Sequence, residues 1–226
     1  MDTISTRDRE ILRQRARRQL EYAHAPRNDV ILKQWQAQAA GRREAPPVRL
    51  LFSNFRHEVV TPRLQCEGDL ARGIEAVLLG ALVGRELFDD DTPVSPTFDV
   101  GWQTTVRPFG LTPKITRAAG PNAQGFHIDP VIHDLAAEID RLRGGSFGVD
   151  RDATARRHEL LDGLFGDILP VRRVMGSLSG MLTNPLVQLM GMEAYYLAMY
   201  DCPDAVHEVM EMGTAVYERY YDFLEE

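Results

Sequence analysis

A cluster of polar side chains able to bind an anion and to exchange a proton follows the first strand-like run of the chain. The run VRLLFSNF at residues 48–55 has the apolar composition of a short strand, and Asn54, Arg56 and His57 lie at its end. The planar fork of an arginine such as Arg56 suits a substrate carboxylate, and an imidazole such as His57 titrates near neutral pH. The sequence therefore predicts an anion-binding site here.

The same arginine has a structural interpretation. Glu58 and Glu67 lie close to Arg56 in sequence, and either could form a surface ion pair with it. Local sequence leaves both interpretations open.

A second candidate site lies in residues 167–191, DILPVRRVMGSLSGMLTNPLVQLMG. An apolar run typical of a buried strand is followed by glycines and by an Asn-Pro helix start, the pattern of one strand–turn–helix unit. Such units bind ligands at the carboxyl end of the strand, which predicts that Ser177, Ser179, Thr183 and Asn184 face a cavity. The alternative is that the glycines form a turn and the polar side chains cap a helix.

The acidic residues offer one further candidate and little support for a metal site. Asp99 lies between two apolar residues and precedes a glycine, so it either caps a turn or acts in a site. The three aspartates at 89–91 lack the alternating spacing of a calcium loop and predict a solvated turn. His127, Asp129 and His133 are close in sequence, but an intervening proline breaks the helical register that would align them. We therefore expect no metal in this segment.

Composition limits the classes of protein that this chain can represent. Its 226 residues are 44% hydrophobic and 26% charged, enough for one large domain or two small ones, and the net charge is −7. That charge argues against nucleic acid or an anionic membrane as the main partner. The two cysteines, Cys66 and Cys202, provide no disulfide framework, and neither a secretory signal nor a membrane-spanning run is visible. We expect a cytoplasmic protein.

Helical periodicity dominates the rest of the chain. It predicts an N-terminal helix, a second helix that Asn28 caps, and a long amphipathic helix at the C-terminal end. Residues 106–130 are punctuated by proline and glycine and predict a loop-rich excursion or a small hairpin. The predicted helices cover approximately residues 6–24, 28–40, 69–84, 131–143, 152–165, 185–202 and 203–224.

Four segments together resemble the uroporphyrinogen decarboxylase superfamily, in a diverged branch. They are PPVRLLFSNFRHE, FDVGWQTTVRPFG, LPVRRVMGSLSGMLTNPLVQLMG and DCPDAVHEVMEMGTAVYERYYDFLEE. The resemblance implies an α/β fold of the (β/α)₈ TIM-barrel type, of which this chain would be the N-terminal portion. It divides the chain into an N-terminal helical extension at residues 1–45 and a barrel part at residues 46–226.

The resemblance also assigns roles to residues. Arg56 matches one of a pair of arginines that bind substrate carboxylates in the family. Asp99 is the nearest match to the catalytic aspartate, a carboxylate that accepts hydrogen bonds from pyrrole N–H groups and stabilises a protonated ring. Gly180 and Asn184 stand where the family has a threonine and a tyrosine.

The implied function is an enzyme that acts on a tetrapyrrole, as decarboxylases of porphyrin metabolism do. One alternative is a corrinoid-dependent methyltransferase of the same superfamily, with zinc and a corrinoid as cofactors; the decarboxylases need no cofactor. A second alternative is a catalytically inactive fragment that associates with a partner chain. The expected partner is a small-molecule substrate, with a homodimer as a further option and no nucleic acid or membrane.

Overall fold

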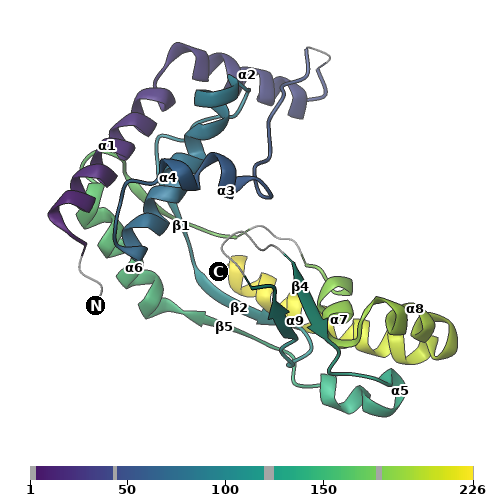
Figure 1. Cartoon of the computed structure of the whole chain (residues 1–226). Helices are drawn as coiled ribbons and strands as arrows, with labels where there is room; N and C mark the ends of the chain where they lie inside the picture. The colour runs from purple at the N-terminus through teal and green to yellow at the C-terminus, as the bar shows by residue number, and fades with distance from the viewer. Residues whose placement is uncertain (1–3, 43–44, 120–124, 177–179, 226) are drawn as a thin grey trace. The chain divides into compact units, whose positions relative to one another are not determined.

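Helices dominate the computed structural model, which describes residues 4–42, 45–119, 125–176 and 180–225 (Figure 1). Helical residues make up 58%, and the strands of the described ranges form three separate two-stranded sheets. The chain divides into two compact units. Unit 1 comprises residues 1–100 and 155–174, and unit 2 comprises residues 101–154 and 175–226.

Unit 1 is built around two long helices, α1 (Thr6–Ala23) and α4 (Asp69–Phe88), which pack against each other. Both have apolar residues at helical spacing, and Leu12, Ile74 and Leu78 from these stripes are buried in one core. The core also takes Phe165 from α6 (Arg151–Phe165), a helix that begins in unit 2. Burial of these stripes is what holds the helices together.

Shorter elements complete unit 1. Helix α2 (Pro26–Ala39) follows α1 after a short turn, and α3 (Arg56–Val59) precedes a 3₁₀ turn, η1 (Thr61–Arg63). Strand β1 (Phe98–Gly101) pairs with β6 (Val171–Val174). Residues 1–45, expected as a helical extension, thus supply α1 and α2, and α1 packs on α4 as part of the unit's main core.

Unit 2 combines two antiparallel two-stranded sheets with helices. Strand β2 (Gln103–Arg107) pairs antiparallel with β5 (Ser146–Asp150), with Thr105 opposite Gly148, and β3 (Lys114–Arg117) pairs antiparallel with β4 (Phe126–Asp129). The helical part consists of α5 (Leu135–Glu138), η2 (Ile139–Leu142), α7 (Thr183–Met190), α8 (Met192–Asp201) and α9 (Pro203–Glu225). Helix α9 lies against β2 and β5 (Figure 1), and its Val209 is fully buried.

The predicted TIM barrel is wrong: in the described ranges the strands are short and pair two by two. The segment 48–55, expected as its first strand, is extended chain ending in a turn. Two of its backbone N–H groups donate to carboxylates instead of to a neighbouring strand. The Val48 N–H donates to Asp91 Oδ2 at 2.9 Å and the Leu50 N–H to Asp90 Oδ2 at 3.0 Å. These bonds satisfy amides that a strand would satisfy in a ladder.

Two expected helix caps are also wrong. Asn28 lies inside α2 and is buried, with its side-chain amide bonded to the backbone N–H and carbonyl of Val94. Helix α7 begins at Thr183 with Leu182 at the N-cap, so Asn184 falls within the first turn. The 106–130 region contains a hairpin, β3–β4, which was one of the two expectations for it, whereas the helix predicted over 131–143 is reduced to α5 and η2.

Candidate functional site

A pocket of about 450 Å³ lies in unit 1 where the 49–53 segment and α3 meet α4. Leu50, Phe52, Val60 and Val83 give it apolar walls, and Arg56 is the charged side chain at its edge that the sequence singled out. The volume falls within the roughly 300–1,000 Å³ usual for small-molecule sites.

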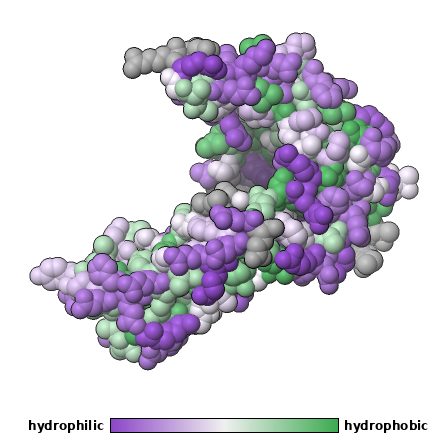
Figure 2. All heavy atoms as spheres, turned by 180° about the vertical axis from the view of Figure 1, so that it is seen from behind, coloured by the Kyte–Doolittle hydropathy of each residue, from purple (hydrophilic) through white to green (hydrophobic). Residues whose placement is uncertain are grey.

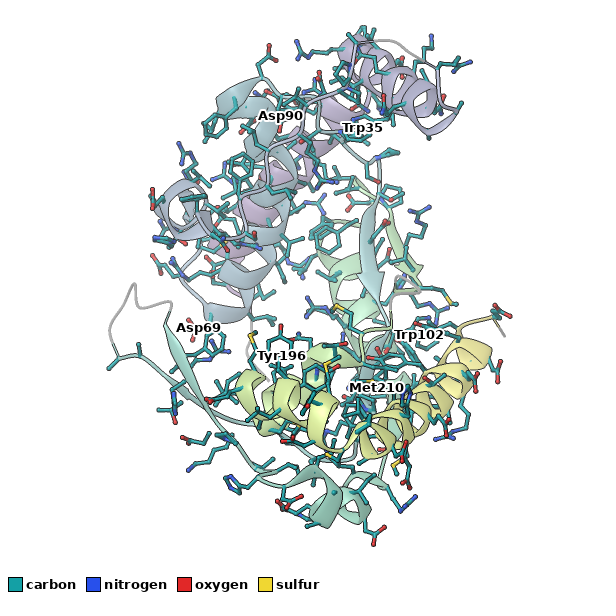
Figure 3. All side chains as sticks on the ribbon, turned by 90° about the vertical axis from the view of Figure 1, so that its right-hand side faces the viewer. Trp35, Asp69, Asp90, Trp102, Tyr196 and Met210 are labelled. Carbon is teal, nitrogen blue, oxygen red and sulfur yellow. The ribbon has the colours of Figure 1, made fainter. Side chains whose placement is uncertain are left out.

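A buried carboxylate holds two residues that line the pocket, Leu50 and Thr92. Asp90 is 7% exposed and accepts hydrogen bonds from the Leu50 N–H, the Thr92 N–H and the Thr92 hydroxyl. Gly84 on α4 permits this arrangement, because a Cβ atom there would lie 2.5 Å from Asp90 Oδ2. Figure 3 labels Asp90 near Trp35, whose indole N–H donates to the Asp91 carbonyl at 2.7 Å. Sequence reasoning treated residues 89–91 as a solvated turn and missed this role.

Arg56 brings a positive charge to the pocket, and the part of the chain that the structure describes provides no acidic partner for it. Its Nη2 donates to the Ala76 carbonyl at 2.7 Å, and no carboxylate of the described ranges lies within ion-pair distance. The expected alternatives are occupied elsewhere, since Glu67 pairs with Arg7 and Glu58 lies 3.4 Å from His57 Nε2. A guanidinium has five N–H donors, so Arg56 retains donors for an anion in the pocket.

The remaining candidates of the 48–58 region lie beside the pocket. Asn54 and His57 are neighbours of Arg56 in the chain, and neither is among the described residues that line the pocket. The imidazole of His57 is a third exposed and faces Glu58. The structure therefore brings Arg56 alone of the three into the cavity.

Asp99 lies on β1 and is held by a bidentate ion pair. Arg172 on β6 donates from Nε to Oδ1 at 3.1 Å and from Nη2 to Oδ2 at 3.0 Å, and the Thr97 hydroxyl donates to Oδ1 at 2.8 Å. The hydrogen bond from Arg172 is the main reason that the pKa of Asp99 lies below its usual value. Asp99 is not among the described residues lining the Arg56 pocket. Its catalytic role stays a prediction.

The glycine-rich candidate is described only in part. Ser177 and Ser179 lie outside the described residues. Thr183 and Asn184 are exposed in the first turn of α7, in unit 2.

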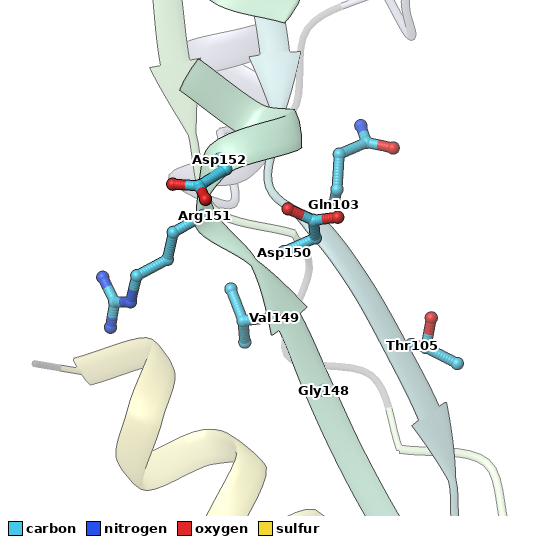
Figure 4. Close-up of a pocket in the computed structure, with 7 residues that line it drawn as sticks. All are labelled: Gln103, Thr105, Gly148, Val149, Asp150, Arg151 and Asp152. Atoms are coloured by element: carbon cyan, nitrogen blue, oxygen red, sulfur yellow. The ribbon is translucent and has the colours of Figure 1, made fainter. Parts of the chain in front are cut away.

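A shallow hollow of about 590 Å³ on unit 2 was not predicted from the sequence (Figure 4). Gln103 and Thr105 of β2 line it, together with Gly148 and Asp150 of β5. The polar residues Gln103 and Thr105, two positions apart and so on the same side of β2, were the available signal. Asp150 caps α6 by accepting from the Ala153 N–H at 2.7 Å, and the neighbouring Arg151 stacks 5.3 Å from the Phe223 ring centroid. These are structural contacts, so the hollow is a weaker candidate than the Arg56 pocket.

In the part of the chain that the structure describes, no three His, Cys, Asp or Glu side chains gather as a metal site would require. His127 and Asp129 do approach each other, with 3.2 Å between Nε2 and Oδ1, and Lys114 joins the same carboxylate. Asp89 ends α4 in the left-handed conformation at φ 50° and pairs with Arg27.

No protein family, curated protein or solved structure matches this chain. Among the described residues, no helix combines the length and the apolar composition needed to cross a membrane.

Proposed function

We propose that the protein acts on a small molecule that carries carboxylate groups on an apolar body, and that it binds this molecule at the Arg56 pocket. The observation that carries the proposal is an arginine that has no acidic partner among the described residues and lies beside apolar walls. A carboxylate bound there would satisfy the free donors of Arg56 in a planar, two-pronged geometry. Leu50, Phe52 and Val83 would cover the apolar part of the molecule.

Among such molecules we propose a tetrapyrrole, the substrate class implied by the resemblance to the uroporphyrinogen decarboxylase superfamily. A porphyrin-type ring has carboxylate arms on an apolar macrocycle, which fits the pairing of charge and apolar wall in this pocket. At about 450 Å³ the pocket would hold one edge of the ring and one arm. The decarboxylase-like reaction, with Asp99 as its catalytic carboxylate, is a separate part of the proposal, because Asp99 is not among the described residues lining this pocket.

The chemistry of Asp99 is compatible with that role. Its low pKa keeps the carboxylate ionised at neutral pH, the form that accepts hydrogen bonds from pyrrole N–H groups and stabilises a cationic ring. To accept them, Asp99 would exchange part of its bonding with Arg172.

The test is a binding titration of the full chain with coproporphyrin, in which the shift of the coproporphyrin absorption band reports binding. Arg56→Gln removes a hydrogen bond to a charged group worth about 1.5–3 kcal/mol, so we expect the Kd to rise roughly 10- to 100-fold. The matched control is Arg17→Gln, which removes the same charge from α1 in the same unit, where Arg17 pairs with the exposed Glu10. The control should bind as the original chain does.

The methyl ester of coproporphyrin provides the second part of the test, because the ester has the same ring but lacks the negative charges. Equal affinity for ester and acid would contradict the proposal, as would an Arg56→Gln chain that binds the acid with unchanged Kd.

We also propose a cytoplasmic location. Cys66 and Cys202 are both free thiols, and burial of Cys66 raises its pKa to about 12, which makes it chemically inert. Two unpaired thiols fit a reducing compartment.

A further inference from the structure

The outward face of α8, here called the α8 face, is covered by large apolar side chains that reach solvent. Tyr200 is 88% exposed and Tyr196 60%, and Figure 3 labels Tyr196 on this helix. The α8 face comprises Met192, Tyr196, Leu197, Met199 and Tyr200, each at least 50% exposed.

The opposite side of α8 is already used for folding. Tyr195 and Ala198 are buried in the core of unit 2, where α8 packs against α7 and α9. Large apolar side chains therefore lie on both the buried and the exposed side of α8, with Glu193 and Asp201 as the charged residues of the helix. A helix with apolar side chains on both sides is typically covered more fully than one with a single apolar stripe. Five side chains of this size present on the order of 500 Å², comparable with the largest apolar patch of a typical monomer.

The charged side chains in the stretch of chain that contains α8 are of one sign. From Met175 to Glu218 the chain contains no lysine or arginine. Glu193 and Asp201 lie on α8 itself, next to the apolar side chains. The carboxylates of this stretch are Glu193, Asp201, Asp204, Glu208, Glu211 and Glu218, of which Glu208 is paired with Arg143.

We propose that the α8 face is a docking site for an amphipathic helix of another protein, with apolar residues on one side and lysine or arginine beside them. Charge complementarity selects this occupant, because basic residues would meet the acids flanking the face. Methionine and tyrosine suit such a groove, since methionine adapts its shape and tyrosine has an apolar ring with a polar end. The area suits one helix, being smaller than the approximately 800 Å² per partner of a standard interface.

A second copy of this chain fits the α8 face less well. In a two-fold contact the same surface meets itself, so Glu193 and Asp201 would face the same two carboxylates of the other copy. With no basic residue between Met175 and Glu218 to separate them, these like charges would repel.

The test uses a fluorescently labelled synthetic helix that has leucine at positions i, i+3 and i+4 of each repeat and lysine at all remaining positions. Its control peptide keeps the leucines and replaces lysine with glutamate. We expect the full chain to bind the lysine peptide in a fluorescence anisotropy titration and to bind the glutamate peptide at least tenfold more weakly. Tyr196→Gln together with Tyr200→Gln should weaken binding of the lysine peptide at least tenfold.

Matched variants separate the α8 face from general stickiness and from unfolding. Ile115→Gln with Phe126→Gln removes two other exposed apolar side chains of the same unit, on β3 and β4, and should leave the Kd unchanged. Glu193→Gln with Asp201→Asn should weaken binding and reduce its salt dependence. Circular dichroism should be the same for all variants, because each replaced side chain is exposed.

Three outcomes would overturn the proposal. The two peptides could bind equally, or the β3–β4 variant could lose as much affinity as the α8 variant. The third is a dimer in sedimentation velocity that becomes a monomer on Tyr196→Gln with Tyr200→Gln, which would assign the α8 face to a second copy. The test is independent of the Arg56 pocket.

Discussion

Buried carboxylates replace sheet hydrogen bonds at several places in unit 1. Asp8, 2% exposed, accepts from the backbone N–H groups of residues 67 and 68. Glu75, fully buried, accepts from those of residues 65 and 66, and Asp90 holds the 48–55 segment through residue 50. Each carboxylate fixes an irregular segment onto a helix without any strand pairing. The pocket wall around Leu50 depends on this arrangement.

Glu75→Gln should destabilise the chain by about 1.5–3 kcal/mol, the range for hydrogen bonds to a buried charged group. The substitution removes the negative charge of a carboxylate that accepts hydrogen bonds from two backbone N–H groups, at 2.8 and 2.9 Å, and from the guanidinium of Arg15 at 3.1 Å. Urea unfolding measures the loss. The control is Glu10→Gln, an exposed pair with Arg17 that should change stability by less than about 1 kcal/mol. Equal effects at the two positions would refute the structural role of Glu75.

At the scale of elements, the short helix α5 depends on its caps. Asp134 accepts from the Ala137 N–H at the N-cap, and Glu138 accepts from the N–H groups of His133 and Asp134. These two backbone bonds are the main reason that the pKa of Glu138 falls to about 2. Four residues are too few to form a stable helix alone, so the caps do much of the stabilising.

This shift predicts a pH dependence with a definite sign. Because the folded pKa lies below the unfolded value of about 4.3, ionised Glu138 stabilises the fold above that value, and the contribution is lost as pH falls toward 2. The difference in unfolding free energy between the original chain and Glu138→Gln should be constant above about pH 5 and shrink below pH 4. Denaturant unfolding at several pH values measures it. A difference independent of pH would contradict the capping role.

Helix α9 packs closely through a glycine. A Cβ atom at Gly213 would lie 2.5 Å from Leu182 Cδ2 and 2.9 Å from Phe109 Cε1, whose ring is buried. Gly213→Ala should therefore destabilise the chain by about 1–3 kcal/mol through overpacking. Gly73→Ala in α4, where a Cβ atom meets nothing within 4 Å, should instead stabilise it by about 0.4–1 kcal/mol. Thermal unfolding compares them, and the same sign for both would rule out the tight contact at Gly213.

At the scale of the whole molecule, surface chemistry is unevenly distributed along the chain. The face in Figure 2 shows hydrophobic and hydrophilic residues intermixed. Basic residues concentrate in α1, where Arg13 pairs with Asp167 and Arg18 with Glu86. By contrast, the stretch from Met175 to Glu218 contains aspartate and glutamate but no lysine or arginine. The net charge of −7 hides this asymmetry, so composition alone did not indicate the α8 face.

The sequence by itself determined the long helices. The predicted helices at 6–24, 69–84, 152–165 and 203–224 correspond to α1, α4, α6 and α9. Helical periodicity and the bonds from residue i to residue i−4 are local, so a short window of sequence contains most of the information.

Only the tertiary structure decided the strand pairing outside the β3–β4 hairpin, and only it decided the site. The 48–55 segment has the composition of a strand, but it forms no ladder in the described structure. Two of its N–H groups donate instead to Asp90 and Asp91, which lie some forty positions later in the chain. In the same way Arg172 forms an ion pair with Asp99, a residue 73 positions earlier in the chain. Arg56 lies at the pocket because its guanidinium donates a hydrogen bond to the Ala76 carbonyl on α4. Partners so distant in the chain are chosen by packing of the helices, and the local pattern around each residue does not specify them.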